Sequence, residues 1–161
     1  MQDDHKKLWD KIKDIRVTMM VTMEADHTLR SRPMYTQQAE YEGQLWFFTK
    51  DDAPKTDEIE GDRHINLAYT NPNDDTYVSV SGIARLVHDR QKAEEIWNPV
   101  VKAWFPEGLD DPHLGLLRVE PTQAEYWDAS SSKMVQLFKM GKAIVQGEEA
   151  GNLGDNEKLS L

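Results

Sequence analysis

Cysteine is absent from this chain, long apolar runs are missing, and positive charge is scarce. Without cysteine, disulfides, thiolate nucleophiles and zinc–sulfur sites are excluded. Lysine and arginine number 19 against 29 aspartates and glutamates, and the net charge of −10 argues against nucleic-acid binding, which depends on positive side chains. No apolar run approaches membrane-spanning length, and the N-terminus lacks the basic-then-apolar order of a signal peptide. The sequence therefore predicts a soluble cytoplasmic protein.

The motifs of several common enzyme classes are also missing. There is no Gly-x-Ser-x-Gly, no Walker-type loop and no Gly-x-Gly-x-x-Gly. The five histidines include no pair at i,i+3 or i,i+4, which favours surface or capping roles over a metal site. The acids at 51–52 and 57–58 suggest a metal cluster, but acids near a helix start are favoured by its positive end, and we prefer that interpretation. We predict no metal site and no catalytic side chain.

The chain has the length and composition of one globular domain. Its 161 residues, 39% hydrophobic and 30% charged, are enough to bury a core. No internal repeat and no long linker divides it. We therefore expect a single domain over residues 1–161, with a mobile acidic loop at 147–156.

The spacing of apolar residues predicts strands with helices inserted between them. Alternation predicts strands over 17–23 (with one well-buried face), 28–41, 45–50, 65–69, 77–88 and 114–128, and a short closing strand over 159–161. Helices are predicted from residue 3 or 4, from 54, after 89 (with Pro99 splitting or kinking it) and after 130. Pro33 implies an edge strand or a bulge, and Gly82 a bulge or a close backbone approach. Six or seven strands with such helices indicate a small barrel of the mainly-β or α+β class.

Positive and aromatic side chains gather in the predicted hairpin over 28–50. Arg30 and Arg32 share one strand face, and two adjacent guanidiniums need either an anion between them or acids to pair them. Phe47 and Phe48 point to opposite faces, so at least one belongs to the core. Lys55 follows at a helix start, where free backbone N–H groups favour an anion. These residue types suit a phosphorylated aromatic cofactor.

Tryptophans outside the hairpin leave their roles open. Trp97 and Trp104 lie on an apolar helical stripe, which favours a core or an interface over ligand contact. Trp127 ends a strand, where an indole either joins the core or covers a planar ligand.

Taken in order, these segments resemble the pyridoxamine 5′-phosphate oxidase-like flavin-binding split barrels, in particular their general stress protein branch. The resemblance covers residues from about 8 to 144. It is carried by the segments 32–34, 45–49, 54–59, 65–69, 77–82 and 124–128.

The resemblance implies a six-stranded antiparallel split β-barrel with peripheral helices. It also implies a homodimer with FMN, or FAD in its place, in two equivalent interface clefts. The resemblance also implies a role for each site residue. Arg32, Pro33 and Met34 would run beside the flavin ring, and Phe48 and Thr49 would line the ring and the ribityl chain. Lys55, with Arg30 or Arg32, would hold the phosphate, and Trp104 and Trp127 would approach from the partner subunit or the C-terminal segment.

The chain departs from the branch at one position, since Ala53 stands where a serine is common, two residues before the lysine. One hydroxyl donor to the phosphate is then missing, and Asp51 and Asp52 repel the phosphate unless they face away. Nothing in the sequence indicates pyridoxamine phosphate oxidation. We expect an FMN-binding oxidoreductase of unknown substrate. The alternatives are a non-catalytic flavin-binding stress or sensor protein, or a split barrel for haem or deazaflavin.

Overall fold

The structure of the chain, a computed structural model, describes residues 2–36, 38, 40–129, 145 and 154–161. The helices are α1 (Gln2–Ile12), α2 (Pro54–Gly61) and α3 (Arg90–Ile96), followed by the short 3-10 turns η1 (Val101–Ala103) and η2 (Gly108–Asp110). The strands are β1 (Val17–Met23), β2 (Leu29–Tyr35), β3 (Leu45–Lys50), β4 (His64–Asn71), β5 (Thr76–Val87), β6 (Leu114–Ala129) and β7 (Gly154–Ser160). In the described part of the chain, no helix is long and apolar enough to cross a membrane.

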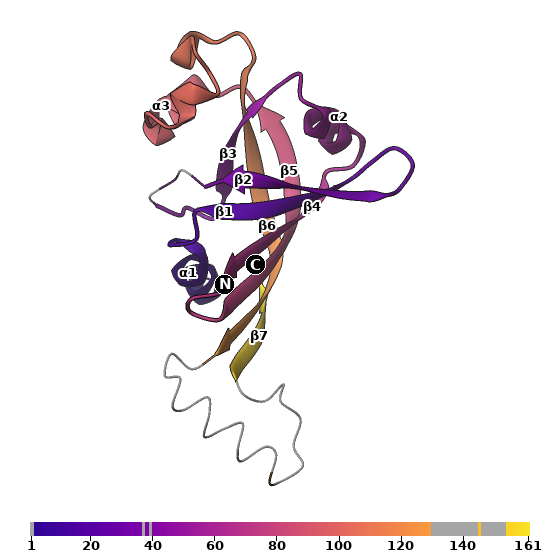
Figure 1. Cartoon of the computed structure of the whole chain (residues 1–161), viewed down its shortest axis with the longest axis vertical. Helices are drawn as coiled ribbons and strands as arrows, with labels where there is room; N and C mark the ends of the chain where they lie inside the picture. Colours follow the sequence, from indigo (N-terminus) through magenta and orange to yellow (C-terminus); the bar gives the residue numbers. More distant parts are fainter. Residues whose placement is uncertain (1, 37, 39, 130–144, 146–153) are drawn as a thin grey trace.

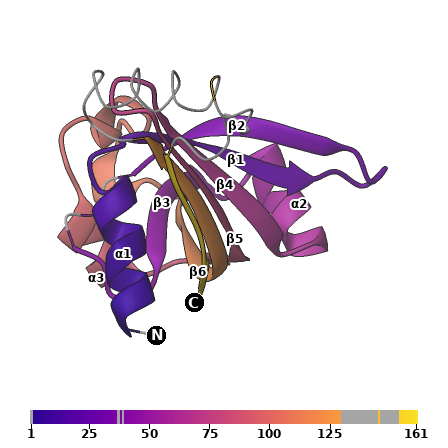
Figure 2. The same ribbon diagram turned by 90° about the horizontal axis from the view of Figure 1, so that it is seen from below.

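All the strands join one antiparallel sheet in the order β2-β1-β4-β5-β6-β3, and β7 pairs with the far half of β6. Among the described residues no ladder joins the edge strands β2 and β3, so the sheet stays open. This is the predicted antiparallel split barrel with peripheral helices, extended by a seventh strand. In both views α1 and α2 lie toward opposite ends of the β1–β2 hairpin, and Figure 1 shows α3 separated from both of them (Figures 1 and 2).

One core fills the concave side of the sheet and holds α1 and α2 against it. Leu8 and Ile12 of α1 and Ile59 of α2 are 1% exposed and join this core. A second, smaller cluster packs α3 on the outer side of β3 and β6, through Trp46 and Ile96 among others. The three helices therefore cover separate regions of the sheet, and among the described residues no other helix covers the rest of its outer face.

The strand over 17–23 has its one buried face, but that face is the more polar of the two. Thr18, Met20 and Thr22 are buried, while Val17 is 46% and Met19 38% exposed. An apolar outer face on a central strand signals a surface that something else covers.

Other predicted elements need correction at their ends. The second strand stops at Tyr35 rather than at residue 41, and Pro33 lies in an edge strand, as predicted. The stripe after residue 89 breaks into α3 and η1 around Pro99, because proline lacks the N–H that would continue the helix. The closing strand begins at Gly154, so the end of the loop expected over 147–156 is paired strand instead. The rest of that loop and the helix predicted after 130 lie outside the described residues.

Gly82 marks a bulge and a close backbone approach, both as its position predicted. The β5–β6 register shifts between Ser81 and Gly82, and a Cβ on Gly82 would lie 2.7 Å from the carbonyl oxygen of Glu120. Side-chain carbons do not approach a backbone atom that closely, so the strands can pair here only with glycine.

Replacing Gly82 by alanine is expected to destabilise the protein. The added methyl group must push two paired strands apart, which costs about 1–3 kcal/mol of unfolding free energy. Urea denaturation measures the loss as a lower midpoint at unchanged slope. Gly61→Ala is the matched control, since its Cβ position has nothing within 4 Å. Equal stability of the two variants would contradict this role of Gly82.

Candidate functional site

A cleft of about 370 Å³ opens between the β2–β3 side of the barrel, the start of α2 and the segment after α3. Its volume is in the range of small-molecule sites. Most of the predicted binding residues line it: Pro33, Met34, Phe48, Thr49, Lys55 and Trp104. The hairpin, the lysine and the tryptophan, far apart in the sequence, thus meet in one place.

The sequence missed about half of the lining. The additional residues are Val17, Tyr35, Lys50, Val100, Val101 and Phe105, together with Ala53, which the sequence had marked only as a departure. A signal existed for Val100 and Val101, which lie on the apolar stripe after residue 89. For Val17 and Tyr35 the signal was weaker: apolar side chains on the outer face of two paired strands.

The aromatic wall of the cleft is built around Phe48. Its ring meets Trp97 edge to face, with centroids 5.6 Å apart and planes at 88°, and lies 6.4 Å from the ring of Phe105. Phe47, on the opposite face, is fully buried in the core, as the alternation of the strand predicted. Trp104 is 69% exposed although it lines the cleft from the same chain. One side of the cleft is therefore a packed aromatic wall, and the other side carries an exposed indole.

Lys55 supplies the positive charge of the cleft. Burial, and then the nearby guanidinium of Arg32, lower the pKa of Lys55, while Glu58 acts in the opposite direction. Among the residues that the structure describes, no carboxylate comes within ion-pair distance of its ammonium group. A half-buried cation of this kind favours an anionic ligand, because the ligand would replace the hydration that the lysine has lost.

The start of α2 places Lys55 and carries no capping side chain. Pro54 is at the first helical position, and Ala53 precedes it with no side chain to cap the helix. The hydroxyl of Thr56 donates to the carbonyl of Lys50 at 3.0 Å, which fixes the helix to the end of β3. The uncapped helix start faces the cleft through Ala53 and Lys55.

Arg30 and Arg32 are paired by acids in this structure. Arg32, 15% exposed, donates to Glu58 at 2.6 Å and to the hydroxyl of Thr22 at 2.7 Å. That hydroxyl in turn donates to Glu58. Arg30 lies 3.9 Å from Glu58 and 3.6 Å from Glu24, and neither arginine lines the cleft. Of the two possibilities left open by the sequence, the pairing acids are present, and phosphate contact by either arginine stays a prediction.

Trp127 lies away from the cleft. It is 43% exposed on β6, where its strand partner is Tyr77 of β5, 40% exposed. Both side chains belong to the outer face of the sheet, and β5 lies three strands from β2 in the strand order. The approach of Trp127 to a ligand in this cleft, from the partner subunit or from the C-terminal segment, stays a prediction.

Comparison with known proteins identifies a family model and two relatives that match most of the chain. Residues 3–151 match the family model described as pyridoxamine 5′-phosphate oxidase like. Protein bli-3 of Neurospora crassa is 30% identical over 92% of this chain and 79% of its own length. General stress protein 26 of Bacillus subtilis is 27% identical over 84% of this chain and 96% of its own length.

Solved structures agree with the fold. A chain from Jannaschia sp. CCS1 assigned as general stress protein 26 superposes with a TM-score of 0.79 at 23% identity, over 100% of both chains. The general stress FMN/FAD binding protein from Xanthomonas citri superposes with a TM-score of 0.70 at 30% identity, over 82% of this chain and 93% of its own.

The Glu58 network predicts a loss of stability in acid. Burial acts to raise the pKa of Glu58, but hydrogen bonds from Thr22 and Arg32 and the charges of Arg32 and Arg30 outweigh it, so its pKa lies below 4.5. A lowered carboxyl pKa stabilises the folded state above the unfolded value, and this contribution disappears as the pH falls through the folded value. We expect Glu58→Gln to lower the free energy of unfolding by about 2 kcal/mol at pH 7. On acidification, the free energy of unfolding should fall less in this variant than in the parent protein.

Urea denaturation at pH 7 and at successively lower pH values measures both effects. Glu60→Gln, on the exposed side of the same helix, is the matched control and should follow the parent protein. A Glu58→Gln curve parallel to the parent curve at all pH values would argue against the network.

Proposed function

Since the chain belongs to the pyridoxamine 5′-phosphate oxidase-like family, we propose that this cleft binds a flavin, FMN in the first place and FAD as the alternative. The observation that carries the proposal is Lys55, a half-buried lysine without an ion pair among the described residues, at the end of an aromatic-walled cleft. The relative from Xanthomonas citri, named for FMN/FAD binding, supports the same ligand class.

The residues present fit both parts of such a ligand. The ammonium group of Lys55 and the uncapped start of α2 would hold the phosphate. Phe48, Met34 and Trp104 offer apolar surface to the ring, and Thr49 adds a hydroxyl beside the ribityl chain. When bound, the flavin supplies the redox chemistry, and the protein holds it and excludes water from one side.

The Asp51 carboxylate is directed at two histidines, so its charge, but no direct contact, opposes a phosphate at Lys55. His113 and His88 hydrogen-bond to it at 3.0 and 3.1 Å, and these contacts hold the pKa of the Asp51 carboxyl below its usual value. The carboxylate thereby lies against two imidazoles rather than along the cleft. Ala53 still leaves one hydroxyl fewer for a phosphate than a serine would.

A homodimer is part of the proposal, because the outer rim of the cleft is apolar and uncovered. Val17 and Tyr35, Cα partners on β1 and β2, are 46% and 42% exposed, and Val100 and Trp104 across the cleft are 57% and 69% exposed. A second copy packed on this rim would bury these side chains, enclose the ligand and bring its own Trp127 near. The cytoplasmic location stays a prediction from the sequence.

The bound flavin would serve either an oxidoreductase or a protein that only sequesters or senses flavin. None of the described residues that line the cleft is a histidine or a carboxylic acid, so turnover would depend on hydride or electron transfer through the ring. Bleaching of the bound flavin by NADPH or NADH faster than that of free FMN supports the enzyme. Reduction no faster than that of free FMN supports the binding protein.

Flavin binding is tested by FMN titration of the purified protein, followed by quenching of flavin fluorescence. We expect the parent protein to form a saturable FMN complex. Lys55→Ala should bind FMN roughly tenfold to hundredfold more weakly, because a charge-assisted contact is lost. Ala53→Ser should bind FMN more tightly than the parent protein. Lys102→Ala is the matched control, since this lysine lies on η1 beside the cleft but does not line it.

Three results would overturn the proposal in different ways. A Soret band in the purified protein would assign the cleft to haem, and absence of any FMN complex would reject flavin binding. Equal affinity of Lys55→Ala and the parent protein would move the phosphate away from α2.

A further inference from the structure

His88, His113, Asp51 and Asp52 converge outside the cleft, at the point where three neighbouring strands meet the loop before α2. β3 ends directly before Asp51, β6 begins directly after His113, and β5 ends directly before His88. The backbone N–H of Asp51 donates to the carbonyl of His113 at 2.9 Å, which continues the β3–β6 ladder by one bond. The sheet therefore holds these residues together, although Asp51 and His113 are 62 positions apart.

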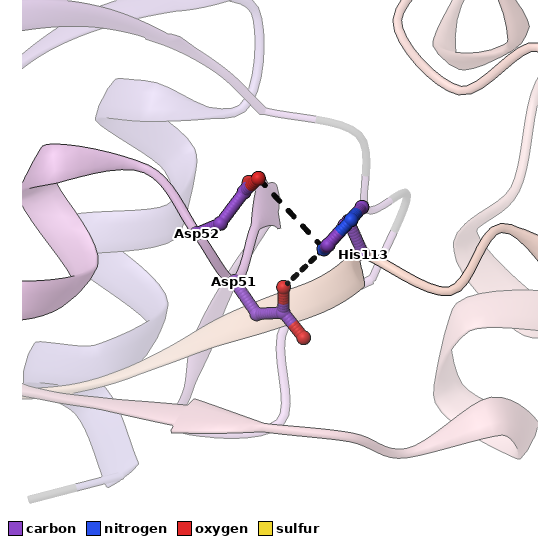
Figure 3. Close-up of side chains that lie close together, drawn as sticks. All are labelled: Asp51, Asp52 and His113. Carbon is purple, nitrogen blue, oxygen red and sulfur yellow. Dashed lines mark hydrogen bonds and ion pairs between the residues drawn. The ribbon is translucent and has the colours of Figure 1, made fainter.

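The donor atoms of the three residues in Figure 3 are spaced like the ligands of a metal ion. His113 Nδ1 lies 3.0 Å from a carboxylate oxygen of Asp51 and 3.8 Å from one of Asp52, and all the donor atoms lie within 4.8 Å of one another (Figure 3). Ligands roughly 2.1 Å from a tetrahedral zinc ion lie about 3.4 Å apart. The observed distances bracket that value, so small side-chain movements suffice to close around an ion.

His88 supplies the outer support that such a site needs. Its Nε2 lies 3.1 Å from the second carboxylate oxygen of Asp51, the one that does not face His113. In metal sites, ligating carboxylates are held by hydrogen bonds of this kind, which orient the free oxygen toward the ion. The pair of Asp62 and His64, 2.9 Å apart, has no such third and fourth partner among the described residues.

We propose that Asp51, Asp52 and His113 form a binding site for a divalent transition-metal ion of the Zn²⁺ type, with His88 positioning Asp51. One imidazole nitrogen with two carboxylate oxygens suits Zn²⁺ better than Mg²⁺ or Ca²⁺, which prefer oxygen alone. Asp52 and His113 are 60% and 55% exposed, so an ion can enter from solvent and water can complete its coordination.

Isothermal titration of the full chain, free of added histidines, with ZnCl₂ tests the site. We expect one saturable Zn²⁺ site per chain, lost in His113→Ala and in Asp51→Asn and weakened about tenfold in His88→Ala. His64→Ala, which removes an equivalent histidine–aspartate pair, is the matched control and should bind as the parent protein does. Thermal unfolding in the presence of EDTA confirms that each variant is folded.

Two outcomes would overturn the site. The first is a parent protein that shows no saturable Zn²⁺ binding. The second is Zn²⁺ binding that is the same in His113→Ala and Asp51→Asn as in the parent protein, which would make the ion adventitious.

A metal ion here would also act on the cleft, an extension that rests on the proposed flavin binding. Asp51 and Asp52 lie between Lys50 and Ala53, which both line the cleft. An ion that neutralises these two carboxylates removes repulsion from a phosphate at Lys55. In FMN titrations, ZnCl₂ should raise the affinity for FMN about fivefold in the parent protein. It should leave the affinity of His113→Ala unchanged. Zn²⁺ binding without any FMN complex would reject the flavin alone, and FMN binding without a Zn²⁺ site would reject the metal alone.

Discussion

The ion pair between Arg32 and Glu58 determines which positive charge remains for a ligand. Both side chains are largely buried, and Thr22 completes the hydrogen bonding between β1, β2 and α2. With Glu58 engaged by Arg32, Lys55, one turn away on the same helix, has no ion-pair partner among the described residues. The same contact fixes α2 against the barrel, so the position of Lys55 and its availability have a common cause.

The net charge of the chain is −10, but two acidic side chains near the cleft are paired with basic partners. Glu58 faces two arginines and Asp51 faces two histidines, so both acids are directed at partners other than Lys55. The local charge of a site can therefore differ in sign from that of the whole protein. Anion binding at the start of α2 is compatible with the acidic composition for this reason.

In the proposed homodimer, the outer face of the sheet would connect the cleft with the subunit interface. Val17 and Tyr35 line the cleft and also belong to the apolar surface that extends over the outer face of β1 and β2. Trp127 lies farther along that face on β6. A cofactor bound in the cleft would bury part of this apolar surface, and a partner subunit would bury the rest. Ligand binding and dimer formation would therefore favour each other.

The sequence alone determined what depends on local periodicity. The strands around Phe48, the helix start at Pro54 and the bulge at Gly82 follow from alternation, proline chemistry and the missing Cβ. The resemblance to flavin-binding split barrels then assigned Met34, Thr49 and Lys55 to one site, and the fold brings them together. Only the tertiary structure decided that Glu58 pairs with Arg32, that Val100 reaches the cleft and that His113 meets Asp51. These contacts join residues on different strands and helices, and no local pattern encodes which side chains a folded sheet brings within hydrogen-bonding distance.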